Sequence, residues 1–104
     1  MGKKEYIIRL KEFKKRLSKE IPIQKIYFFG SRAYGKPKRW SDFDLIIVSS
    51  KFKNKKFRYR AIGFHKHWDL DYPVDFLCYT PEEFNKLKKQ ITIVREATRN
   101  GIEI

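Results

Sequence analysis

The stretch Gly30-Ser31-Arg32 carries groups suited to phosphate binding, and it follows a run of apolar residues. A glycine lets the backbone approach a ligand closely, and a turn that leads from a strand into a helix directs free N–H groups outward, where they bind anions. The hydroxyl of Ser31 and the guanidinium of Arg32 add further donors of the kind that phosphate accepts. We therefore expect these three residues to form a phosphate-binding turn.

Asp42 and Asp44 form a second chemical feature a few residues later. They are two positions apart in a run that resembles a strand, so both side chains point to the same face of that strand. Two neighbouring carboxylates without a counter-charge repel each other, and a divalent cation removes the repulsion. Oxygen ligands that face phosphates favour a hard ion, so magnesium or manganese is expected and zinc is not.

Asp75 is a third candidate, some thirty residues further along the chain. If it points the same way from a neighbouring strand, the three aspartates could hold two metal ions in the arrangement used for in-line displacement at phosphorus. Plainer interpretations exist for each feature. Asp42 and Asp44 could cap a turn, Gly30 and Ser31 could be a turn only, and Asp75 could pair with one of the many lysines.

Short strands and helices must position these residues. Apolar side chains spaced by three and four predict an amphipathic helix from about Tyr6 that ends near Ile21-Pro22, because proline disfavours helical geometry at the residue before it. Runs rich in β-branched and aromatic residues predict strands at 23–29, 43–48 and 74–79. The phosphate-binding turn then follows the first strand, and the aspartates lie at the starts of the other two.

The remaining segments are predicted from caps and charge. Residues 49–60 are rich in lysine and arginine and indicate an exposed loop, followed by a helix over 57–67. Thr80-Pro81-Glu82-Glu83 has the pattern of a capping box and predicts a helix through about Gln90. A further helix over 91–100 should end at Gly101, with 102–104 returning as an edge strand.

The composition sets the class of protein. A chain of 104 residues with 41% hydrophobic residues suits one domain over 1–104, built from one sheet and a few helices. No apolar run is long enough for a signal peptide or a membrane span, and the single cysteine, Cys78, excludes an internal disulfide. We expect a cytoplasmic protein with no membrane association.

The net charge of +13 favours polyanionic partners such as nucleotides or RNA. A lysine-rich surface is also common in proteins from hot environments, so the charge alone does not identify a ligand. His65, His67, Asp69 and Asp71 alternate in a way that suggests zinc, but no cysteine cluster or further histidine completes such a site. We interpret that segment as structural.

Gly30-Ser31-Arg32-Ala33-Tyr34-Gly35, followed by Ser41-Asp42-Phe43-Asp44 and a later strand with Asp75, resembles the Gly-Ser and Asp-x-Asp signature of the DNA polymerase beta superfamily of nucleotidyltransferases. The resemblance is strongest to the minimal nucleotidyltransferase (MNT) group and covers about residues 6–80. It implies an α/β (α+β) fold with a small mixed sheet flanked by helices. One departure is Tyr34, where many small relatives have a basic residue; Lys36, Lys38 and Arg39 could compensate.

The resemblance also implies roles for the candidate residues. Gly30 and Ser31, with Arg32, would bind the triphosphate of ATP. Asp42 and Asp44 would hold Mg²⁺ or Mn²⁺, and Asp75 would complete one metal site and help deprotonate the acceptor hydroxyl. The expected enzyme is a nucleotidyltransferase that moves AMP from ATP onto an acceptor.

The acceptor surface is not explained by these motifs. MNT proteins commonly act as antitoxins beside a HEPN ribonuclease toxin and adenylylate it, so the resemblance implies a protein adenylyltransferase with a HEPN-type partner. A homo-oligomer and an RNA acceptor stay open. The alternative is a non-catalytic module that keeps the fold and binds RNA or protein.

Overall fold

The computed structural model describes residues 2–104, and its centre is a four-stranded sheet in the order β3-β2-β1-β4. The strands are β1 (Lys25–Phe29), β2 (Phe43–Val48), β3 (Val74–Tyr79) and β4 (Ile102–Glu103). Strand β2 runs parallel to β3, whereas β1 is antiparallel to both of its neighbours. The predicted mixed sheet and its strands, including the short returning edge strand, are confirmed.

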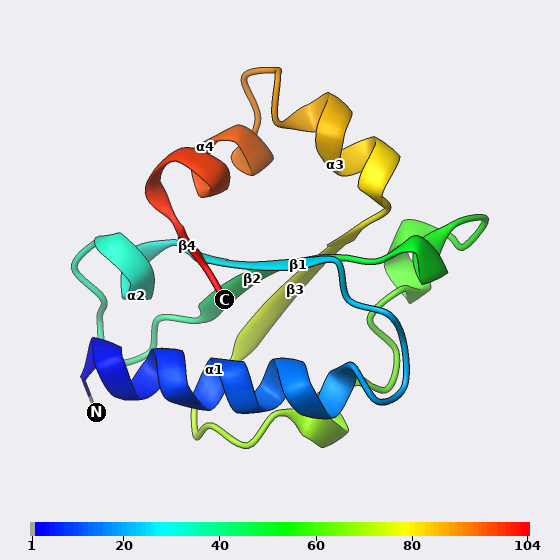
Figure 1. The fold of residues 1–104 in the computed structure, drawn as a ribbon. Coiled ribbons are helices and arrows are strands. Elements are labelled where there is room, and N and C mark those ends of the chain that lie inside the picture. The colour runs from blue at the N-terminus through cyan, green and yellow to red at the C-terminus, as the bar shows by residue number, and fades with distance from the viewer. Residues whose placement is uncertain (1) are drawn as a thin grey trace.

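Helices cover both faces of the sheet (Figure 1). Helix α1 (Lys3–Leu17) lies along one face, and α3 (Pro81–Leu87) with α4 (Ile93–Asn100) arches over the other. Successive side chains of β2 point to opposite faces of the sheet, so this strand contributes to a hydrophobic cluster on each face. Leu45 and Ile47 pack in the cluster with α1, whereas Ile46 and Val48 pack in the cluster with α3 and α4. The sheet is thus buried on both faces, which explains the nearly continuous apolar sequence of β2.

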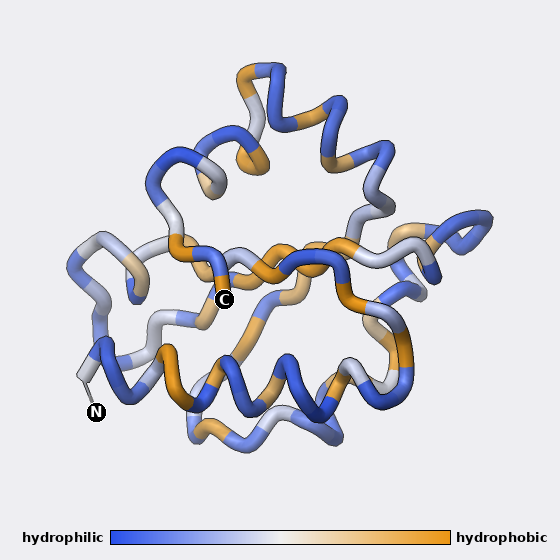
Figure 2. Tube along the Cα trace, viewed as in Figure 1, coloured by the Kyte–Doolittle hydropathy of each residue, from blue (hydrophilic) through white to orange (hydrophobic). Residues whose placement is uncertain are grey.

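Hydropathy along the chain follows this layering (Figure 2). The strands are coloured mainly hydrophobic, while helix α1 alternates between hydrophilic and hydrophobic turns. The inward positions of α1 are Tyr6, Leu10, Phe13 and Leu17, as the spacing predicts. No helix within residues 2–104 has the length and apolar character needed to cross a membrane.

The predicted helix over 57–67 is wrong. The structure has two short 3₁₀ helices instead, η2 (Phe57–Tyr59) and η3 (Phe64–His67), after another at η1 (Ser50–Phe52). Gly63 separates η2 from η3 in the left-handed region, with φ of 88°. A left-handed residue interrupts the helical hydrogen-bond ladder, so the apolar residues here could not form a continuous helix.

Capping side chains set the ends of the last two helices. The capping box at Thr80 is confirmed, with its hydroxyl accepting from the Glu83 N–H and the Glu83 carboxylate accepting from the Thr80 N–H. Helix α3 ends at Leu87, earlier than predicted, and α4 begins after Thr92 rather than at residue 91. The Thr92 hydroxyl accepts from Arg95 N–H and donates to the Leu87 carbonyl, so one side chain organises the turn between them.

Candidate active site

Strand pairing brings the Gly30-Ser31 turn, predicted to bind phosphate, and two of the aspartates to one end of the sheet. Phe29, the last residue of β1, pairs with Asp44 near the start of β2. Asp44 in turn pairs with Asp75 near the start of β3. Because β1 is antiparallel to β2 and β2 is parallel to β3, the turn that follows Phe29 lies beside Asp44, and Asp75 lies one strand further along the same end of the sheet.

Gly30 is in direct contact with this carboxylate cluster. It has φ of 81°, in the region that favours glycine, and it is the N-cap of the single-turn helix α2 (Ser31–Tyr34). A Cβ at this position would overlap Oδ2 of Asp44. The glycine is therefore required twice, once by its backbone conformation and once by the space that Asp44 occupies.

The three aspartates form no ion pair with any basic side chain among residues 2–104. Burial raises the pKa of Asp44 above its ordinary value, and the negative charges of Asp75 and then Asp42 raise it further. In the part of the chain that the structure describes, none of these three carboxylates forms an ion pair or accepts a hydrogen bond from a side chain. A chain with 25 Lys and Arg residues thus leaves its most crowded carboxylates unneutralised.

The oxygen atoms of these three aspartates are of the type that binds a hard divalent cation, but they do not form a complete coordination site. Asp42 and Asp75 are exposed and Asp44 is half-buried. Among residues 2–104, no three His, Cys, Asp or Glu side chains already converge as metal ligands. Carboxylate oxygens without a counter-charge suit magnesium or manganese, and the remaining positions would have to come from water or from a ligand.

Arg32, predicted to contact a nucleotide, is buried and turned toward the loop that precedes Asp42. Its guanidinium donates to the carbonyl oxygens of Ser41 (2.7 Å), Lys38 (3.3 Å) and Arg39 (3.3 Å), and to the Tyr6 hydroxyl (3.1 Å). None of these acceptors belongs to the Gly30-Ser31 turn. The nucleotide contact stays a prediction, and the position of the side chain does not favour it.

Tyr34 connects the turn to helix α4, and the sequence analysis did not predict this contact. Its hydroxyl donates to Oε1 of Glu96 at 3.0 Å. Burial and the contact with Glu96 raise the pKa of Tyr34, and the charge of Asp44 adds to the rise, whereas a backbone contact with Gly30 opposes it. The Tyr34 hydroxyl therefore links the turn to α4 and lies near enough to Asp44 to feel its charge.

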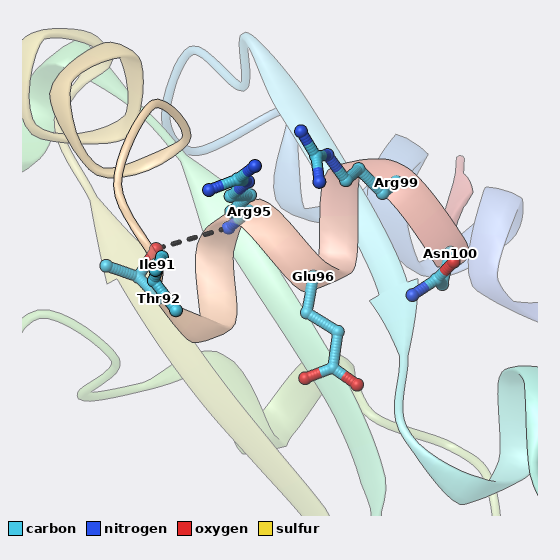
Figure 3. Close-up of a pocket in the computed structure, with 6 residues that line it drawn as sticks. All are labelled: Ile91, Thr92, Arg95, Glu96, Arg99 and Asn100. Atoms are coloured by element: carbon cyan, nitrogen blue, oxygen red, sulfur yellow. Dashed lines mark hydrogen bonds between the residues drawn. The ribbon is translucent and has the colours of Figure 1, made fainter.

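A shallow concavity of about 440 Å³ lies next to this contact, on α4 and the turn before it (Figure 3). Glu96 points away from Arg95 and Arg99 in the close-up, and both of these arginines lack a carboxylate partner among residues 2–104. The lining residues are Ile91, Thr92, Arg95, Glu96, Arg99 and Asn100. No predicted site residue lines the concavity, so it is not part of the carboxylate cluster.

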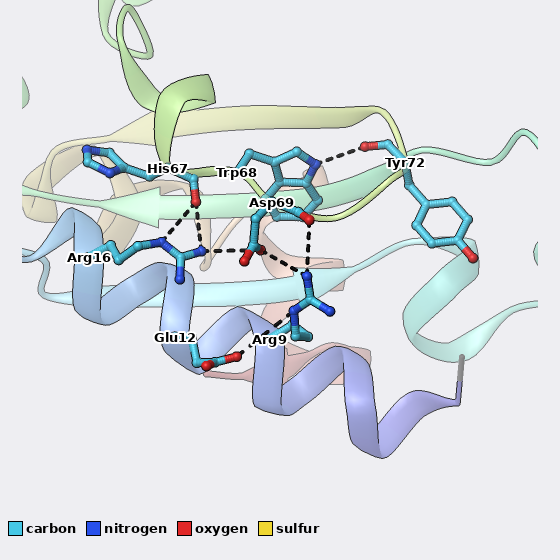
Figure 4. Close-up of polar contacts among 7 residues, drawn as sticks. All are labelled: Arg9, Glu12, Arg16, His67, Trp68, Asp69 and Tyr72. Carbon is cyan, nitrogen blue, oxygen red and sulfur yellow. Dashed lines mark hydrogen bonds and ion pairs between the residues drawn. The ribbon is translucent and has the colours of Figure 1, made fainter.

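The segment 65–71 that resembles a zinc motif is used in packing against α1 (Figure 4). Arg9 and Arg16 lie 3.4 and 3.3 Å from Oδ1 of Asp69, and Arg16 also donates to the His67 carbonyl oxygen at 2.8 Å. The His67 ring lies 3.0 Å from a Glu20 carboxylate oxygen. Polar side chains here fasten a loop to a helix.

Comparison with known proteins agrees with this geometry. Residues 10–99 match the model of the nucleotidyltransferase domain family. The chain belongs to this family. A relative in Haemophilus influenzae, named "Probable protein adenylyltransferase MntA", is 30% identical over 89 residues, which are 84% of this chain and 78% of the relative.

A solved structure has the same fold. It is a crystal structure of a nucleotidyltransferase from Sulfolobus solfataricus, with a TM-score of 0.58 and 19% sequence identity over 99% of this chain and 87% of its own. The resemblance to a minimal nucleotidyltransferase is thereby confirmed, as is the fold class. The individual roles of Gly30, Ser31, Asp42, Asp44 and Asp75 stay predictions.

Proposed function

We propose that this nucleotidyltransferase moves AMP from ATP onto a hydroxyl of a partner protein. The observation that carries the proposal is the set of three unneutralised carboxylates at the sheet end where Gly30 and Ser31 form a tight turn. The similarity to a relative named as a protein adenylyltransferase supports a protein as the acceptor. A HEPN-type toxin is the partner that the MNT resemblance favours, with this chain as its antitoxin.

The proposed division of labour follows from position. Backbone N–H groups and the hydroxyl at Ser31 bind the β- and γ-phosphates, and Asp42 and Asp44 hold Mg²⁺ or Mn²⁺, with Asp75 completing one site. When bound, the metal ions polarise the phosphate oxygens and neutralise developing charge. The acceptor oxygen attacks the α-phosphorus, the bond to the β-phosphate oxygen breaks, pyrophosphate leaves, and the acceptor proton passes to the Asp75 carboxylate.

The first test uses ATP labelled at the α-phosphate, with Mg²⁺ and lysate from the host. We expect a labelled protein band with the wild-type chain and none with Asp42→Asn. Asp71→Asn is the matched control, because Asp71 is also exposed but lies outside the cluster. Equal labelling by wild type and Asp42→Asn would contradict the proposal, and loss of labelling in the control would show that the substitution acts through the fold.

A non-catalytic RNA-binding module is the second candidate, favoured by an exposed basic and aromatic surface. Phe57 and Tyr59 are 43% and 44% exposed, and Arg58 lies 4.8 Å from the centroid of the Tyr59 ring. Single-stranded nucleic acid binds where its bases can stack on exposed aromatic rings and its phosphates can contact basic side chains. RNA affinity that falls steeply with salt, together with no metal-dependent ATP binding, would favour this candidate over the transferase. Label on RNA instead would identify RNA as the acceptor.

A further inference from the structure

We propose that Arg32 is a positioning residue that fixes the loop 36–41, and through it Asp42, without contacting the nucleotide. The inference about catalysis rests on the proposed function, because Asp42 matters there as a metal ligand. The inference about the loop rests on geometry alone and is tested separately.

The guanidinium has almost no donor left for a ligand. An arginine has five N–H groups. The acceptors described above engage the Nε group through Ser41, one Nη1 group through Tyr6, and both Nη2 groups through Lys38 and Arg39. The residue is 6% exposed. A phosphate at the Gly30-Ser31 turn would therefore have to displace existing hydrogen bonds to reach Arg32.

The charge of Arg32 is compensated by dipoles and rings. Within residues 2–104 no carboxylate lies within ion-pair distance of it. Instead its Cζ atom lies 4.1 Å from the centroid of the Tyr72 ring and 5.4 Å from that of Phe43. Cation–π contacts and three carbonyl oxygens stabilise a buried guanidinium, whose cost would be large without them. Such an arrangement indicates a role in holding backbone in place.

The loop that Arg32 holds has little other support. Residues 34–40 are exposed, and Trp40 is 72% exposed. The other hydrogen bonds recorded within 36–41 are internal, from Ser41 N–H to the Lys38 carbonyl and from Lys38 N–H to the Ser41 hydroxyl. Arg32 is therefore the link between this loop and the packed aromatic side chains of the α1 core.

Asp42 depends on that link more than Asp44 does. Asp44 is fixed within β2 by pairing to Phe29 and Asp75. Asp42 precedes the strand, and the carbonyl that accepts the shortest Arg32 hydrogen bond is that of Ser41, in the peptide bond to Asp42. Because Arg32 directly follows Ser31, one short segment both forms the turn and places the first aspartate.

Lysine cannot replace arginine in this role. An ammonium has three donors on one atom, whereas the four contacts here are spread around a planar fork. Arg32→Lys therefore keeps the charge and loses the geometry. Tyr6→Phe is a milder variant, since it removes only the hydroxyl contact, and it serves if Arg32→Lys folds poorly.

The first test is limited trypsin digestion of the folded protein under native conditions. We expect Arg32→Lys to speed cleavage after Lys38 and Arg39 by about 10-fold or more, since freeing a loop exposes its backbone to proteases. Cleavage at the exposed lysines of 51–56 in the same sample is the internal reference for protease activity outside the loop and should not change. Arg58→Lys is the matched control, because Arg58 is an exposed arginine outside the loop. Unchanged cleavage at 38 and 39 would overturn the proposal.

The second test separates positioning from nucleotide contact. For Arg32→Lys we expect kcat to fall by about 10- to 100-fold and the Mg²⁺ concentration for half-maximal rate to rise, as for other residues that orient metal ligands. KM for ATP should change less than about 2-fold. A raised KM with unchanged kcat and digestion would show that Arg32 binds phosphate instead. If the wild-type chain transfers no AMP, the proposed function fails, and the digestion result still decides the role of Arg32 in the loop.

Discussion

Acidic side chains in this protein serve in two contrasting environments. At the start of β2 and β3, Asp42, Asp44 and Asp75 have no basic partner among residues 2–104, and burial together with the charges of Asp75 and Asp42 raises the pKa of Asp44. Elsewhere, Glu83 forms a bidentate pair with the buried Arg60, and Asp69 lies between two arginines. The second set is already paired, whereas the first set has carboxylates available for the metal ions of the proposed function.

The difference shows how a strongly basic chain can leave a few carboxylates without basic partners, as the proposed cation site requires. Its 25 Lys and Arg residues could neutralise every carboxylate, yet the central ones are left without them. Arginines close to the site are committed elsewhere, with Arg32 bonded to loop carbonyls. Clustered carboxylates without basic partners indicate a functional site, whereas carboxylates in ion pairs indicate a structural role.

The largest expected effect contrasts the two environments directly. Asp75→Asn should lower AMP transfer by about 100-fold or more, which corresponds to about 2.7 kcal/mol of lost transition-state stabilisation. Asp69→Asn should leave transfer within about 2-fold of wild type, since its partners are structural arginines. Initial rates with labelled ATP and the labelled acceptor band provide the measurement. Equal losses in both variants would erase the proposed distinction.

The next effect concerns stability at the Arg60–Glu83 pair. Glu83→Gln should lower the free energy of unfolding by about 2 kcal/mol, because it weakens both the contact with a nearly buried guanidinium and the capping box of α3. Chemical denaturation measures the loss. Glu82→Gln, at the neighbouring exposed position, is the control and should cost less than about 0.5 kcal/mol.

The same pair has a pH signature. The hydrogen bond from Arg60 is the main cause that holds the pKa of Glu83 below its ordinary value of 4.5. A carboxyl whose pKa is lowered by folding contributes stability above the unfolded value and loses it as pH falls through the folded value. Wild type should therefore lose more stability in acid than Glu83→Gln does. Parallel loss in the two proteins below pH 4.5 would count against the pair.

Local sequence signals predicted the parts of the site that depend on local geometry. Three features are determined by residues close together in the sequence. They are the glycine before a short helix, the aspartates two positions apart, and the capping box at Thr80. The strand at 74–79 was predicted correctly, but its pairing with β2 was only a condition of the sequence argument, and the structure supplies the pairing of Asp75 with Asp44. The family resemblance then joined these separate signals into one site.

Long-range contacts account for what the sequence did not reveal. Tyr34 and Glu96 are 62 positions apart, and Arg60 reaches Glu83 across 23 positions. No periodicity or spacing connects such pairs, so the arginine within the basic segment looked like another exposed charge. The predicted nucleotide contact of Arg32 has a related explanation. An arginine is well suited to bind phosphate, and only the folded structure shows that its N–H groups already donate to other acceptors.

A smaller effect should appear where the carboxylates repel each other. Besides its expected loss of transfer, Asp44→Asn should raise the melting temperature at pH 7 by about 1–3 °C, a small gain because solvent screens the charge of a half-buried carboxylate. Burial and neighbouring charges raise the pKa of Asp44 above its ordinary value of 3.8, so its ionised form opposes folding. Without added metal, thermal unfolding of both proteins measures the difference.

The sign with pH is opposite to that of Glu83. The cost of ionised Asp44 is absent below the unfolded pKa and grows as pH rises through the raised folded value. The gain from Asp44→Asn should therefore be present at pH 7 and shrink toward pH 3.8. Added Mg²⁺ should also shrink it, by stabilising wild type through binding. A variant that is less stable at pH 7 would indicate that Asp44 has a partner in the folded protein.

The smallest effect is expected at Asp69, although two arginines surround it. Its side chain is 50% exposed, and solvent screens such pairs, so Asp69→Asn should lower the free energy of unfolding by less than about 0.3 kcal/mol. Two backbone hydrogen bonds explain why the loss is small.

Arg9 still donates to the Asp69 carbonyl at 3.0 Å and Arg16 to the His67 carbonyl at 2.8 Å, and the substitution removes neither acceptor. Asp71→Asn, exposed and close in sequence, is the control for denaturation at low and high salt. A loss near 2 kcal/mol that persists in high salt would mean that the Asp69 carboxylate itself, rather than these two carbonyls, fastens the loop to α1.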